Sequence, residues 1–173
     1  MYSPIIRLIL SSFAILYGGY KLYIDVSDIE AWLFLFAGGA MIWGYFRYGT
    51  IWKAWRFYKK NDLEGLEIQL SHIKKPEWLN AQNKAYFHWL NGVILSRDEK
   101  WKEAYDNFEI ASKGPLRTEN ALSVVYVCLA DTAVFLSDYV RAKEHLKRAK
   151  ELDHNEGVQK GIEEVELKIG NVI

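Results

Sequence analysis

The chain has 173 residues, half of them hydrophobic, and its 22 Lys and Arg residues balance its 22 Asp and Glu residues. A chain with no net charge does not favour nucleic-acid binding, which draws on an excess of basic residues. The single cysteine, Cys128, excludes an internal disulfide and suits a reducing compartment.

Two apolar stretches occupy the first fifty residues. The first, residues 8–20, is uncharged, and the second, residues 31–46, also carries no charge. The first stretch continues to residue 24 if Lys21 extends its ammonium group toward the membrane interface. Each is close to the roughly 20 residues that a helix needs to cross a hydrocarbon core of about 30 Å. We therefore predict a transmembrane hairpin in residues 1–48, with spans at about 6–24 and 31–48.

The charges beside these stretches predict their orientation. Residues 1–60 hold 7 Lys and Arg against 3 Asp and Glu, and the acids lie in the loop of residues 25–30. Because basic residues near span ends remain in the cytoplasm, we expect both termini and the remainder of the chain to be cytoplasmic. The expected location is the bacterial inner (plasma) membrane, with the lipid bilayer as one partner.

Small residues within the spans predict close packing. Ala14 and Gly18, and likewise Ala40 and Gly44, lie four residues apart, a spacing that lets helix backbones approach in lipid. The partner of this face is either the other span of the hairpin or another membrane protein.

The chain from residue 49 onward is predicted to be entirely helical. Its apolar residues recur at intervals of three and four and are interrupted by short polar breaks. Asp62, Asp98 and Asp138 lie close to three predicted helix starts, where a carboxylate can accept a backbone hydrogen bond. The predicted helices cover residues 50–60, 62–73, 77–96, 99–112, 118–136, 138–152 and 156–169.

A spacing of 38 residues relates these helices in pairs. Residues of similar size or polarity recur at this interval in six sets, which predicts stacked helical hairpins. The sets are Ala54, Gly92 and Ala130; Phe57, Leu95 and Ala133; Leu63, Trp101 and Tyr139; Leu66, Ala104 and Ala142; Leu70, Phe108 and Leu146; and Ile73, Ala111 and Ala149.

Residues of the middle pair resemble a tetratricopeptide repeat (TPR): Gly92, Leu95, Trp101, Ala104, Phe108, Ala111 and Pro115. Ala130, Tyr139, Ala142, Leu146 and Ala149 resemble a second copy. The period of 38 departs from the usual 34, and His88 and Asn91 replace large apolar residues. The resemblance implies a TPR-like α-α superhelical (solenoid) domain over residues 49–173, with repeats at about 50–75, 77–114 and 118–152 and a capping helix at 156–169.

The resemblance also implies a groove that binds a peptide or helix of a partner protein, and another membrane protein is one candidate for that partner. Its lining would come from the first helices of two repeats: Tyr86, Trp89, Val93, Arg97, Val124, Val127, Asp131 and Phe135. Two alternatives stay open. Trp89, Val127 and Phe135 are either groove residues or core residues, and Asp131 either faces a partner or pairs locally with a neighbour such as Arg97.

The sequence offers no constellation for catalysis. The histidines, His72, His88, His145 and His154, never pair at i and i+4, and Cys128 has no basic neighbour to activate it. We expect no enzyme activity, catalytic residue, cofactor, metal or small-molecule substrate, and no nucleic-acid partner. The expected function is a membrane-tethered scaffold or adaptor that assembles or organises a membrane complex. The alternative is a small accessory structural subunit of a larger integral membrane complex.

Overall fold

The computed structural model describes residues 4–48 and 51–171, with the side chains of residues 4, 5, 7, 8 and 45–48 left out. Throughout those two ranges the regular elements are helices and no strand occurs, which confirms the predicted all-α fold class. The chain divides into two compact units, Met1–Gly49 and Thr50–Ile173.

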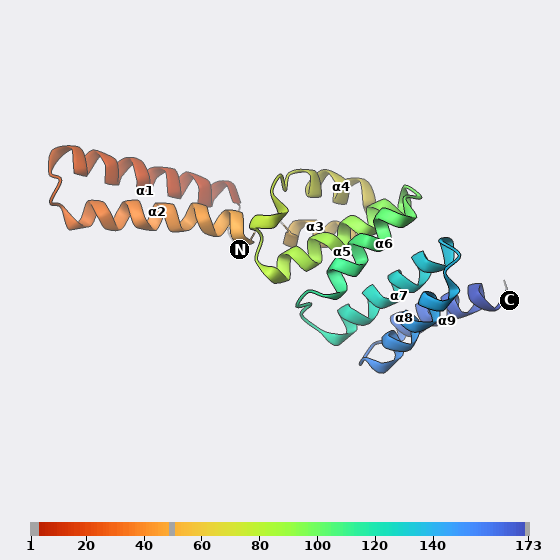
Figure 1. The fold of residues 1–173 in the computed structure, drawn as a ribbon. Helices are drawn as coiled ribbons and strands as arrows, with labels where there is room; N and C mark the ends of the chain where they lie inside the picture. Colours follow the sequence, from red (N-terminus) through yellow and green to blue (C-terminus); the bar gives the residue numbers. More distant parts are fainter. Residues whose placement is uncertain (1–3, 49–50, 172–173) are drawn as a thin grey trace. The chain divides into compact units, whose positions relative to one another are not determined.

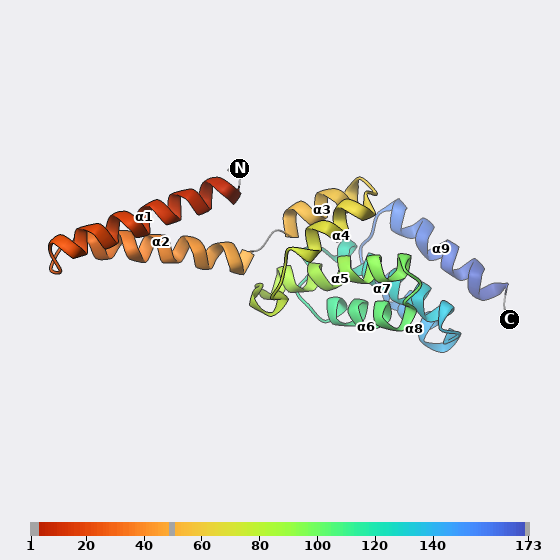
Figure 2. The same cartoon turned by 90° about the horizontal axis from the view of Figure 1, so that it is seen from above.

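The first unit is a hairpin of α1 (Pro4–Ile24) and α2 (Ile29–Tyr48), which lie side by side in Figures 1 and 2. Small residues seven apart form the seam: Ser11 and Gly18 on α1, and Ala31 and Gly38 on α2, are buried. A Cβ atom on Gly18 would lie 2.9 Å from the carbonyl oxygen of Ala31, so the backbones approach closely there.

The seam uses only part of the predicted small-residue face. Gly18 lies in it, but Ala40 is exposed and a Cβ atom on Gly44 would meet nothing within 4 Å. Ala40 follows Gly38 by two residues, which turns it about 200° around the helix and away from α1.

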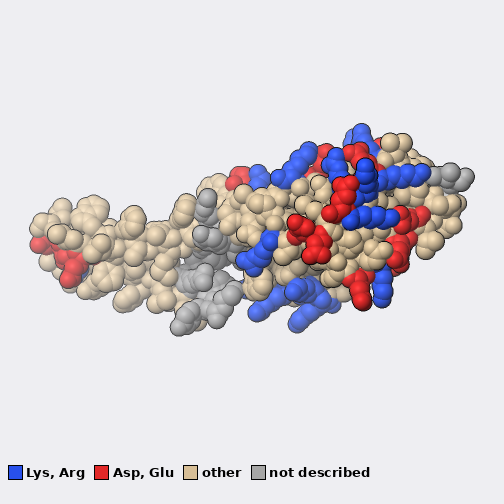
Figure 3. Space-filling model, turned by 90° about the horizontal axis from the view of Figure 1, so that it is seen from below, with Lys and Arg blue, Asp and Glu red and all other residues tan. Residues whose placement is uncertain are grey.

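Large apolar side chains cover the outer surface of the hairpin. Phe13, Leu16 and Phe36 are 68%, 72% and 79% exposed. The charged side chains described in this unit lie at its loop end, where Lys21 Nζ lies 2.6 Å from Glu30 Oε2 and 3.1 Å from Asp28 Oδ2. On the face drawn in Figure 3, the charged side chains of the hairpin that are coloured gather at that end.

Within the described residues, none of the helices combines the length and the apolar character that crossing a membrane requires, so the predicted pair of spans has no structural support there.

The second unit consists of helices packed in pairs (Figures 1 and 2). The pairs are α3 with α4, α5 with α6, and α7 with α8; each pair contacts the next, and α9 contacts α7 and α8. Their bounds are α3 Ile51–Lys59, α4 Leu63–Ser71, the 3-10 helix η1 Pro76–Trp78, α5 Ala81–Arg97, α6 Trp101–Ser112, α7 Glu119–Phe135, α8 Tyr139–Glu151 and α9 Glu156–Gly170.

The polar residues at helix starts confirm two of the three predicted caps. Asp62 accepts a hydrogen bond from Gly65 N, and Asp138 accepts one from Arg141 N. Asp98 instead follows α5 as its C-cap, and α6 begins after Lys100, whose side chain forms no capping bond. The predicted helix 77–96 is also divided, because η1 ends at Trp78 and Asn80 caps a new helix.

The turn inside each helix pair is the same and recurs every 38 residues. Asn61, Glu99 and Ser137 have φ angles of 56°, 59° and 61°, in the left-handed region. The amide of the next residue bonds back across the turn in each case: Asp62 N to Phe57 O, Lys100 N to Leu95 O and Asp138 N to Ala133 O, all at 2.9–3.0 Å. These are Schellman turns, which satisfy the last carbonyl groups of each first helix.

Candidate functional site

The α5 residues predicted to line a groove form an aromatic core. Trp89 is only 2% exposed, and its ring centroid lies 5.0 Å from that of Trp55 and 5.7 Å from that of Tyr58. Tyr86, half-buried, stacks on Trp89 at 5.8 Å. Trp89 is therefore a core residue, and its Nε1 atom is buried with no hydrogen-bond partner in the described chain.

The other two α5 residues lie nearer the surface. Val93 is half-buried and packs against the cluster that contains Trp89. Arg97 is exposed, and one of its Nη atoms lies 2.7 Å from Glu67 Oε2 and 2.7 Å from Asp98 Oδ1. The predicted groove cation therefore links α5 to α4.

The α7 residues of the predicted groove lie largely against α9. Val124 and Val127 pack on the apolar cluster that α9 shares with α7 and α8. A Cβ atom on Gly161 of α9 would lie 3.3 Å from Val127 Cγ1. Because α9 occupies this side of α7, Val124 and Val127 have little open surface.

Lys168 of α9 lies beside both Asp131 and Phe135. Lys168 Nζ of α9 lies 2.5 Å from Asp131 Oδ1, so the carboxylate pairs within the fold, but with Lys168 and not with Arg97. Phe135 stacks on Trp101 at 3.9 Å and remains 47% exposed. Arg97 and Phe135 are the members of the predicted groove that the structure leaves most accessible.

The residues that depart from the TPR pattern form a polar network. His88 Nδ1 lies 2.9 Å from Asn107 Oδ1, which also accepts a hydrogen bond from Asn91 Nδ2 at 3.3 Å. Asn107 Nδ2 in turn donates to Glu103 O. Between α5 and α6, His88 and Asn91 form hydrogen bonds where the TPR pattern has apolar contacts. Asn107, the polar residue opposite them in α6, was the sequence signal that could have predicted this network.

A second polar contact joins the later helices. His145 Nε2 lies 2.8 Å from Tyr105 Oη, while His145 Nδ1 is buried without a partner in the described chain. Burial lowers the pKa of His145. Burial also raises the pKa of the Cys128 thiol to about 12, so this cysteine is protonated at neutral pH.

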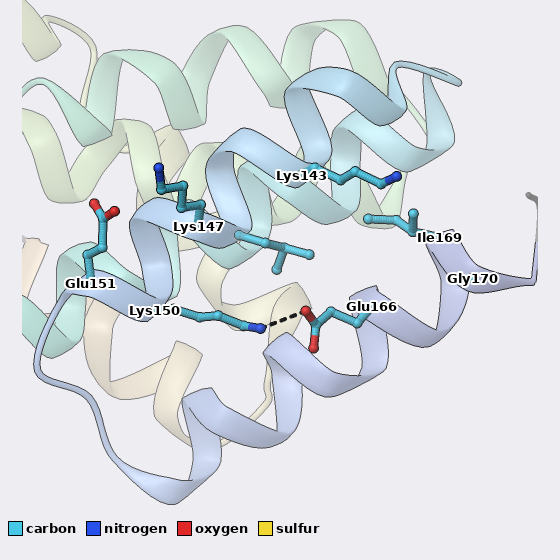
Figure 4. Close-up of a pocket in the computed structure, with 8 residues that line it drawn as sticks. Lys143, Lys147, Lys150, Glu151, Glu166, Ile169 and Gly170 are labelled. Atoms are coloured by element: carbon cyan, nitrogen blue, oxygen red, sulfur yellow. Dashed lines mark hydrogen bonds and ion pairs between the residues drawn. The ribbon is translucent and has the colours of Figure 1, made fainter.

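A hollow of about 750 Å³ lies between α8 and α9 (Figure 4). Two of its lining residues form an ion pair, in which Lys150 Nζ lies 2.6 Å from Glu166 Oε1. Leu146 and Ile169 contribute apolar side chains to the lining. The remaining lining residues are Lys143, Lys147, Glu151 and Gly170. The lining side chains include no serine, threonine or cysteine. In the described part of the chain no group of three His, Cys, Asp or Glu residues could hold a metal ion.

Comparison with known proteins assigns no family, because no family model, no curated protein and no solved structure matches the chain.

Proposed function

We propose that the protein is a membrane-tethered scaffold, whose hairpin lies in the bilayer and whose second unit binds a protein partner in the cytoplasm, in the assembly or organisation of a membrane complex. The apolar exterior of the hairpin carries this proposal. The second unit would be a TPR-like solenoid, and the location would be a bacterial inner membrane with both termini cytoplasmic.

The exposed surface of the hairpin supports the membrane anchor. Soluble monomers rarely expose contiguous apolar patches of more than a few hundred Å², and each Å² costs about 25 cal/mol in water. Trp32, Leu33 and Trp43 add exposed fractions of 56%, 63% and 62% to those of Phe13, Leu16 and Phe36. Helices of 21 and 20 residues have the length that a bilayer core requires.

The repeated geometry of the second unit supports the solenoid. Three helix pairs share one turn conformation at a spacing of 38 residues, and each pair packs on the next. In repeat arrays such stacking buries a continuous core and leaves an extended face for partners. On that face we place Tyr86, Val93, Arg97 and Phe135, which keep accessible surface.

A tether makes weak binding sufficient. A partner segment held near the same bilayer meets the scaffold at a high effective concentration, so the binding face does not need high intrinsic affinity. Low intrinsic affinity is compatible with a binding face that has few charged residues. Tyr86 and Val93, which are uncharged and partly accessible, belong to such a face.

Alkaline carbonate extraction of membranes containing the full chain tests the anchor. The unaltered protein should stay with the membrane, whereas Phe13→Lys, Leu16→Lys and Phe36→Lys together should shift it to the supernatant. The control carries Lys at three exposed apolar positions of the second unit, Ile68, Val140 and Leu167, and should remain in the membrane. Extraction of the unaltered chain would overturn the anchor.

The alternative is an accessory subunit that is permanently buried in a larger membrane complex. A scaffold should be stable in detergent when produced alone, whereas a subunit should aggregate or be degraded. A photo-crosslinker at Phe135 in native membranes should capture a partner protein if the exposed end of α7 belongs to the binding face.

A further inference from the structure

The exposed face of α3 is entirely cationic and aromatic. Trp52, Lys53, Arg56 and Lys59 are exposed, as is Lys60 directly after the helix, whereas Ile51 and Ala54 are buried. At 100° per residue the exposed positions fall within an arc of about 120°. We call these five exposed residues the α3 face.

Among the residues that the structure describes, no carboxylate pairs with a cation of the α3 face. In the described chain, Lys53, Arg56, Lys59 and Lys60 form no ion pair, and no acid occurs between residues 51 and 61. Elsewhere in the second unit many cations are paired, among them Arg97, Lys113, Arg141, Arg148, Lys150 and Lys168. Lys59 Nζ lies 5.9 Å from the centroid of the Trp55 ring. Four like charges in eight residues repel one another, and no ion pair offsets that repulsion among the described residues.

A second segment adds the same chemistry. Lys75 Nζ lies 4.3 Å from the ring centroid of Trp78, and this tryptophan is 49% exposed, as is Trp52. Leu79, next in the chain, is buried in the apolar cluster that also contains Ile51. Half-exposed tryptophans with lysine or arginine are typical of surfaces at the level of lipid headgroups.

We propose that the α3 face binds anionic phospholipid headgroups. The proposal rests on the membrane anchor proposed above, because α3 begins three positions after the last residue of α2. Residues 61–173 hold 15 basic and 19 acidic residues, so an anionic bilayer would repel most of the unit and attract this face. Each cation near such a surface contributes about 1 kcal/mol, or about fivefold in partitioning.

The test uses the full chain in nanodiscs. In a Cys128→Ala background, Trp52→Cys carries an environment-sensitive nitrobenzoxadiazole dye, and discs contain phosphatidylcholine alone or with added phosphatidylglycerol. We expect phosphatidylglycerol to shift the emission to shorter wavelength and to protect the dye from iodide, and high salt to weaken both effects.

Lys53→Glu, Arg56→Glu and Lys60→Glu together should abolish the response to phosphatidylglycerol. The matched control, Lys102→Glu, Lys143→Glu and Lys160→Glu, changes three exposed cations elsewhere and should retain it. Circular dichroism of both variants checks that the helical content is unchanged.

The outcomes separate the two proposals. Protein that does not enter discs overturns the anchor and this inference with it. Protein that enters discs but emits identically in both lipids overturns this inference alone. If a labelled single-stranded RNA binds the full chain, and the triple Glu variant loses that binding while lipid has no effect, the face belongs to nucleic acid and the lipid assignment is wrong.

Discussion

Lys168 Nζ of α9 lies 2.5 Å from Asp131 Oδ1 and 5.1 Å from the centroid of the Phe135 ring. One lysine of the last helix therefore contacts two residues that the sequence had suggested for a partner-binding groove. The ion pair compensates a carboxylate that interrupts the apolar run of α7, and it adds to the apolar packing that places α9 on that side of the helix.

Breaking this ion pair should destabilise the protein slightly. The side chains of Lys168 and Asp131 are 45% and 33% exposed, so we expect Lys168→Met to lower the free energy of unfolding by no more than about 1 kcal/mol. Urea denaturation of Lys168→Met, of Asp131→Asn and of the double variant measures the coupling free energy between the two residues. This coupling should be smaller in 1 M salt, where the screening length is about 3 Å. Lys160→Met, an exposed cation on the same helix, should show no coupling with Asp131.

Glycine at a left-handed turn position should stabilise the fold. Glu99 has a φ angle of 59°, a conformation that costs a residue with a Cβ atom about 1–2 kcal/mol, whereas glycine adopts it without strain. After the entropic cost of glycine, Glu99→Gly should raise the free energy of unfolding by about 0.5–1 kcal/mol. Thermal denaturation compares it with Glu103→Gly inside α6, which should lower stability by about 1 kcal/mol. Equal destabilisation by both would contradict the turn's role.

Gly92 should resist replacement by alanine although it lies inside a helix. A Cβ atom there would lie 2.7 Å from Phe108 Cε1 and 2.8 Å from Cδ1, closer than packing allows. We expect Gly92→Ala to destabilise by about 1–3 kcal/mol despite the better helix propensity of alanine.

Two further variants identify the cause of that loss. Phe108→Leu should destabilise less when Gly92→Ala is present than when it is absent, because the smaller side chain leaves room for the added methyl group. Gly170→Ala, whose Cβ atom would meet nothing within 4 Å, should not destabilise. Purely additive effects of the first two changes in denaturation would show that the Phe108 contact is not responsible.

His145 should make stability depend on pH in the acidic range. Burial, chiefly, and the nearby Arg148 charge lower the pKa of His145, so the neutral imidazole is the form that the fold accommodates. Its contribution is complete above the ordinary histidine pKa of about 6.5 and is lost as the pH falls toward the lowered folded value. His145→Gln should therefore flatten the decline of the melting temperature on acidification.

The half-buried His154 provides the control for this pH dependence. A hydrogen bond to the Leu152 carbonyl, with one to Gln159, raises the pKa of His154. Its protonated form is therefore favoured in the fold, and its contribution is present at low pH and lost as the pH rises. His154→Gln should make the decline on acidification steeper, and a profile unchanged by His145→Gln would contradict the buried-histidine account.

The sequence by itself determined the helices and their repetition, because both follow from local chemistry. Apolar residues at intervals of three and four fix the faces that must be buried, and Asp62 and Asp138 mark helix starts by accepting bonds within one turn. Leu66, Ala104 and Ala142, one of the sets of residues 38 apart, are all fully buried, as their place in the repeat suggested.

The tertiary structure alone decided which residues remain accessible for function. Asp131 finds its partner 37 residues later on α9, His88 and Asn91 find theirs on α6, and Trp89 lies within a cluster completed by α3. A helical period identifies the face that a residue occupies but not the element that covers it, since contacts between distant segments depend on how whole helices pack. For that reason Val127, for which the sequence left groove and core open, is in the fold partly buried against α9.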